Sequence, residues 1–69
     1  MQIRPYSKTE LARAYAPKLT DGSALNRLSR WLHRNETLYT ALKEAGYSER
    51  QRIFSIRQVR IIFEHLGEP

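Results

Sequence analysis

Three arginines between residues 23 and 34 give this chain its clearest chemical signal. Arg27, Arg30 and Arg34 are spaced by three and then four residues, so in a helix they share one face. No acidic residue stands on that face, and Asn26 lies beside the arginines. A guanidinium group donates in a planar fork that fits phosphates and guanine edges, and a side-chain amide can pair with an adenine edge. These residue types are those that reading the major groove of double-stranded DNA requires.

A second basic segment, residues 46–54, carries Arg50 and Arg52. In extended backbone two such residues point the same way, so we expect a wing-like loop that touches phosphates or the minor groove. The full predicted DNA-binding set is Asn26, Arg27, Arg30, His33, Arg34, Arg50 and Arg52. The alternatives are an ordinary solvated helix face for the first group and a solvated hairpin tip for the second.

The charge balance fits a polyanionic partner. Lys and Arg number 12 against 7 Asp and Glu, for a net charge of +5, and nine of the 12 cations are Arg. Arginine stems also cover apolar surface on helices, so charge alone favours nucleic acid no more than it favours a merely basic surface.

Residue types for catalysis and metal binding are sparse. Cysteine is absent, which excludes disulfides, thiolate metal sites and a Cys nucleophile. His33 and His65 lack the neighbours of a zinc site or a nucleophile motif, and the three glycines stand too far apart for a phosphate-binding loop. We therefore expect no enzyme, no cofactor and no metal site.

The chain contains no apolar run near the roughly 20 residues of a membrane span. Residues 1–5 show no apolar core of a signal peptide. A soluble cytoplasmic protein without membrane association is the expectation.

The elements that must position the arginines belong to one domain, residues 1–69, since 69 residues leave no room for a second. Two capping boxes fix helix starts. Ser7 with Glu10, and Ser55 with Gln58, each place a cap three residues before an acid or amide, and each cap follows an aromatic residue.

Apolar periodicity, Asn35 as a cap and Gly46 as a stop complete the helix predictions. The predicted helices are 8–15, 23–34, 36–45 and 56–66. Segments 2–4 and 52–54 alternate polar and apolar residues and could pair as a short two-stranded ribbon. The fold class is therefore mainly α, a small four-helix domain.

The predicted buried side of the second helix carries Leu25, Leu28 and Leu32. Trp31 adjoins this stripe and is expected to pack into the core. On the last helix, Ile61 falls opposite the apolar stripe and is expected at the surface, where it could seed a dimer contact.

Two patterns resemble known families. Residues 6–12 (YSKTELA) and 28–32 (LSRWL) resemble the opening and the recognition helix of MerR-type and excisionase-type winged helix-turn-helix domains. Residues 52–59 (RIFSIRQV) resemble the segment that follows the wing in those domains. The connector before the second helix is longer than their usual tight turn. The resemblance implies a winged helix-turn-helix-like fold that binds DNA.

The chain also resembles, along its whole length, a family of short uncharacterised bacterial proteins. The shared segments are residues 3–12, which open I-R-x-Y-x-[RK]-T-E-L-A in that family, and residues 58–69, which end L-G-x-P. That resemblance implies a small accessory protein of mobile or variable genomic regions and brings no activity of its own.

Together these patterns predict a double-stranded DNA-binding protein, a small transcriptional or mobile-element accessory regulator, working as a homodimer or with a partner protein. The alternative is a protein-protein interaction module without nucleic acid, in which the same arginines meet an acidic partner and Ile61 or Trp31 supplies an apolar anchor.

Overall fold

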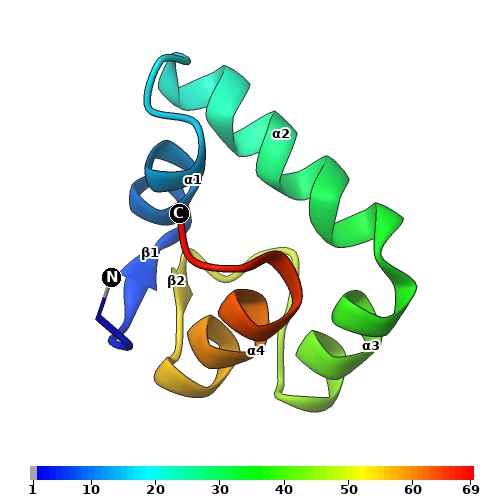
Figure 1. Ribbon diagram of the computed structural model, residues 1–69. Coiled ribbons are helices and arrows are strands. Elements are labelled where there is room, and N and C mark those ends of the chain that lie inside the picture. The colour runs from blue at the N-terminus through cyan, green and yellow to red at the C-terminus, as the bar shows by residue number, and fades with distance from the viewer. Residues whose placement is uncertain (1) are drawn as a thin grey trace.

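The computed structural model describes residues 2–69. Within these residues the elements run in the order β1 (Tyr6–Ser7), α1 (Lys8–Tyr15), α2 (Asp21–Arg34), α3 (Glu36–Glu44), β2 (Ile53–Phe54) and α4 (Ile56–Leu66). The long helix α2 reaches from α1 at one end to α3 at the other, and α4 lies beneath it (Figure 1). The mainly α fold class predicted from the sequence is confirmed.

The core lies where the four helices and the small sheet meet. Phe54 of β2 is fully buried and belongs to one apolar cluster with residues of α1, α3 and α4. Helix α2 adds Leu28 and Leu32, each 3% exposed, so its apolar stripe packs inward as predicted. The other fully buried large side chains are Leu11, Leu38, Leu42, Val59 and Ile62.

Both predicted capping boxes are confirmed. Ser7 Oγ accepts a hydrogen bond from the Glu10 backbone N–H at 3.0 Å, and Glu10 Oε1 accepts one from the Ser7 backbone N–H at 3.4 Å. Ser55 and Gln58 repeat the arrangement at 3.2 and 3.0 Å. Because each box satisfies otherwise unpaired N–H groups, α1 and α4 begin at the predicted residues.

Helix α2 begins at Asp21, two residues before the predicted start at residue 23. The hydroxyl of Thr20 accepts from the Ser23 backbone N–H at 3.3 Å and so acts as the cap. Asp21 then falls in the first turn, where a negative charge is favourable. Helix α3 ends at Glu44, one residue before its predicted end, and Gly46 follows with φ of +85°.

The predicted ribbon exists, but its first strand is Tyr6–Ser7 and not residues 2–4. Tyr6 pairs with Phe54 and Ser7 with Ile53, antiparallel. The shift has a physical cause. Pro5 has no N–H to give to a ladder, and the Tyr6 hydroxyl donates to the Gln2 carbonyl at 2.7 Å, which folds residues 2–5 back over the strand.

The expectation for Ile61 was wrong, because its side chain is half-buried and packs against the core. The exposed large apolar side chains of residues 2–69 are instead Ile3, Ile53 and Ile56, at 40, 60 and 48% exposure. Trp31 is half-buried and packs edge to face on Tyr15, with ring centroids 5.8 Å apart.

Candidate nucleic-acid interface

The outer face of α2 is positioned by the leucines on its inner side. Because Leu28 and Leu32 point into the core, the residues opposite them face solvent. Asn26, Arg27, Arg30 and Arg34 are all exposed, and no hydrogen bond or ion pair within residues 2–69 engages their side chains. The cationic face predicted from the spacing is therefore open.

The outer face has two edges. At 3.6 residues per turn, Asn26 and Arg30 lie almost opposite the leucines, and Arg34 lies toward Trp31. Arg34 and Trp31 line the same shallow depression of about 550 Å³. Asn26 also lines a smaller cavity of about 220 Å³, which reaches across to Glu49. One edge of the face thus adjoins the chain after α3.

That stretch, residues 45–52, is called the basic loop here and is held firmly to α4. Gln58 is 3% exposed, and its Nε2 donates to the Ala45 carbonyl at 3.2 Å. Gln51 Nε2 donates to Gln58 Oε1 at 2.5 Å. A turn then closes between Ser48 and Gln51, whose backbone N–H donates to the Ser48 carbonyl at 3.1 Å. The buried amide of Gln58 therefore fixes where the loop lies beside α2.

The expectation of extended backbone for both loop arginines was only partly right. Arg50 lies in the turn, and Arg52 directly precedes β2. Both side chains are exposed, and neither has a hydrogen-bond or ion-pair partner within the described part of the chain. Together with Lys8 they line a depression of about 500 Å³ between the start of α1 and the loop.

His33 differs from the other predicted contacts, because it already has a partner. Its Nε2 lies 3.1 Å from Glu49 Oε1, on the basic loop. Its ring lies over Tyr39 of α3, with centroids 4.7 Å apart. The Tyr39 hydroxyl donates to the same Glu49 oxygen at 2.7 Å, and that hydrogen bond raises the pKa of Tyr39. These three side chains connect α2, α3 and the loop.

The sequence interpretation missed Lys8. Its Nζ donates to the Glu49 carbonyl at 3.1 Å and lies 4.9 Å from the centre of the Tyr47 ring. The capping box placed Lys8 at the start of a helix, but nothing in its spacing related it to residues more than 40 positions away. Only the tertiary fold brings this third cation to the loop.

Two arginines near α1 are paired with acids. Arg4 donates to Glu10 at 2.8 Å, and Arg13 donates to Asp21 at 2.6 Å. The Arg4 hydrogen bond holds the pKa of Glu10 below its ordinary value, and the same bond raises the pKa of Arg4. The α1 side of the molecule therefore neutralises its arginines, whereas the outer face of α2 does not.

The fold and this face define a small, mainly α-helical domain whose helix α2 presents exposed arginines without ion-pair partners in residues 2–69. Residues 2–69 match the family described as Domain of unknown function (DUF4248), and the chain belongs to that family. The comparison with curated proteins and the comparison with solved structures found no match. None of the helices within residues 2–69 combines the length and apolar character needed to cross a bilayer. The same residues contain no group of three or more His, Cys, Asp or Glu side chains able to hold a metal ion.

Proposed function

We propose that this domain binds double-stranded DNA and acts as a small transcriptional or mobile-element accessory regulator. In this proposal α1, the connector 16–20 and α2 work as a winged helix-turn-helix-like unit. Helix α2 is the recognition helix, and the basic loop serves as the wing. The observation that carries the proposal is the outer face of α2, where three arginines and an asparagine are exposed and have no side-chain partner in residues 2–69.

The dimensions of α2 suit this role. Its 14 residues make a rod of about 21 Å, and the major groove, about 12 Å wide, admits an α-helix. Asn26 and Arg30 occupy the middle of the face and are the residues to read base edges. Arg27 and Arg34 lie toward one edge, where they would reach a phosphate strand or a guanine.

In this proposal the basic loop contacts the DNA backbone beside the groove that α2 enters. Arg50 and Arg52 contact phosphates, which position the protein without reading sequence. Because Gln58 fixes the loop to α4, the backbone that carries these cations is held in place before DNA binds. A domain of this size binds a short site weakly, so a homodimer or a partner protein is expected to supply further specificity.

The test is the affinity of Arg30→Ala for duplex DNA selected from a random pool, with Arg60→Ala as the matched control. Loss of a base contact should weaken Arg30→Ala by about 1–3 kcal/mol and relax specificity at one base pair. Arg60 lies on α4, so its variant should bind like the wild type. Melting temperatures of both should stay close to that of the wild type. Equal affinity of the two variants would contradict the proposal.

An acidic protein partner is the second candidate. The depression beside Arg34 brings the apolar side chains of Trp31 and Leu66 next to a cation, which favours this candidate, although Glu36 also lines it. It predicts no measurable binding to any duplex pool at low salt.

A further inference from the structure

Glu49 stands out among the residues of the candidate interface because it is an acid surrounded by cations. It is the sole acidic residue of the basic loop, and Arg50 follows it directly. A carboxylate at this place repels the phosphates that the proposed function brings to the loop. The presence of Glu49 at the candidate interface therefore needs a structural explanation.

Glu49 places one carboxylate oxygen between two donors. Oε1 lies 3.1 Å from His33 Nε2 and accepts from the Tyr39 hydroxyl at 2.7 Å. The two rings lie against one another, 4.7 Å between centroids and 33° between planes, and both reach the same carboxylate oxygen. An imidazole and a hydroxyl arranged in this way fit any anionic oxygen, including a phosphate oxygen.

The Glu49 carboxylate can move away from His33 and Tyr39 without moving the loop. The Glu49 side chain is 52% exposed and that of His33 is 51% exposed, so the pair lies at the surface. Exposed pairs of this kind hold their partners weakly. The backbone of Glu49 is anchored separately, through its carbonyl to Lys8, and the loop is anchored through Gln51 to Gln58.

We propose that His33 Nε2 and the Tyr39 hydroxyl form a binding subsite for a DNA backbone phosphate, and that the Glu49 carboxylate occupies it in the free protein. This inference rests on the proposed function. On binding, the phosphate takes the place of the carboxylate, and the Glu49 side chain turns into solvent. The acid lowers affinity for every duplex and so restricts stable binding to sites that also satisfy the outer face of α2.

The experiment measures duplex affinity of Glu49→Gln against Glu44→Gln. Glu44 is an exposed acid at the end of α3, so both changes remove one negative charge from the surface. With the competing carboxylate gone, Glu49→Gln should bind about three- to tenfold tighter than wild type. Glu44→Gln should change affinity by less than about twofold, as expected for a screened surface charge.

A second variant tests the donor. Adding Tyr39→Phe to Glu49→Gln removes the hydroxyl. The double variant should bind duplex about threefold more weakly than Glu49→Gln, so that its affinity moves back toward that of the wild type. If wild type binds DNA and Glu49→Gln binds no tighter than Glu44→Gln, the subsite is wrong while the proposed function stands. If the wild type itself binds no duplex, both the subsite and the proposed function are wrong. A melting temperature of Glu49→Gln near that of the wild type checks that the fold is kept.

Discussion

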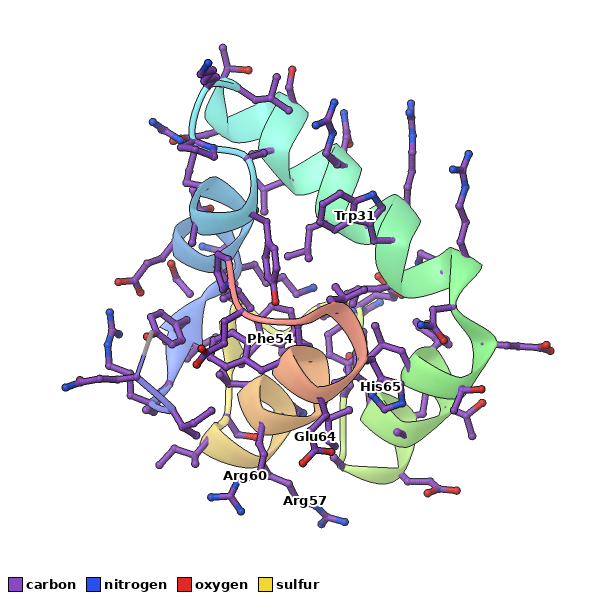
Figure 2. The ribbon with its side chains drawn as sticks, in the orientation of Figure 1. Trp31, Phe54, Arg57, Arg60, Glu64 and His65 are labelled. Atoms are coloured by element: carbon purple, nitrogen blue, oxygen red, sulfur yellow. The ribbon has the colours of Figure 1, made fainter. Side chains whose placement is uncertain are left out.

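Two helices, α2 and α4, expose arginines that have no ion-pair partner in residues 2–69, and they do so in different surroundings. On α2 the exposed arginines have an asparagine beside them and no acid on their face. On α4, Arg57 and Arg60 are exposed and unpartnered within the described residues, but Ile56 and Glu64 share their side of the helix. Figure 2 shows Arg57, Arg60 and Glu64 on the side of α4 turned away from α2.

The number of cations on a helix face therefore says less about its partners than the residues that surround those cations. The α2 face adjoins two depressions that Lys8 and Glu49 line, and Arg50 and Arg52 line one of these as well. On α4, Glu64 follows Arg60 by four residues and partly offsets its field. Within residues 2–69, the α2 side with the basic loop therefore offers a polyanion more unpaired arginines than α4 does.

The largest expected difference is in the free energy of unfolding, between substitutions on the inner and on the outer side of α2. Leu32→Ala removes a buried side chain, 3% exposed, and should lower the free energy of unfolding by about 2–5 kcal/mol. Arg34→Ala, two residues on, should change it by no more than about 0.5 kcal/mol. Urea unfolding monitored by circular dichroism measures both. A large loss of stability in Arg34→Ala would mean that this arginine supports the fold. The α2 arginines would then not form a free binding face, and the contrast drawn with α4 would be wrong.

Two glycines near the interface should respond in opposite directions. Gly22 lies in the first turn of α2, and a Cβ built there meets no atom within 4 Å. Gly22→Ala should therefore stabilise the protein by about 0.5–1 kcal/mol. Gly46 has equal space but a φ of +85°, so Gly46→Ala should destabilise by about 1–2 kcal/mol. Thermal melts measure both, and a shift of the same sign for the two would contradict the reason given.

Local rules predicted the helices well because their signals are local. The two capping boxes and the i, i+3, i+4 stripes depend on residues within one or two turns of each other, and tertiary packing did not override them. The early start of α2 was missed because Gly22 reads as a turn residue, although Thr20 caps in the ordinary way. The first strand was misplaced because alternation in residues 2–4 ignored the proline that follows.

Features that depend on contacts between residues far apart in the sequence could not be predicted from the sequence. Ile61 is covered because α4 packs into the core on more than one side, which one helical stripe does not reveal. The contacts of Glu49 with His33, Tyr39 and Lys8 join four separate segments, and the sequence placed Glu49 only in a basic loop. The exposed arginines of α2 were predictable, because helical spacing alone determines which residues share a face.

The decisive measurement is the dependence of duplex affinity on salt, for wild type and two double variants. If five or six phosphates meet the α2 side, log K should fall against log salt with a slope near −5, by the counterion-release rule of about −0.9 for each contact. Arg50→Ala with Arg52→Ala should make the slope shallower by about 2, and Arg57→Ala with Arg60→Ala should leave it unchanged. A flat dependence for wild type, or an equal change for the two double variants, would contradict DNA binding through the outer face of α2 and the basic loop.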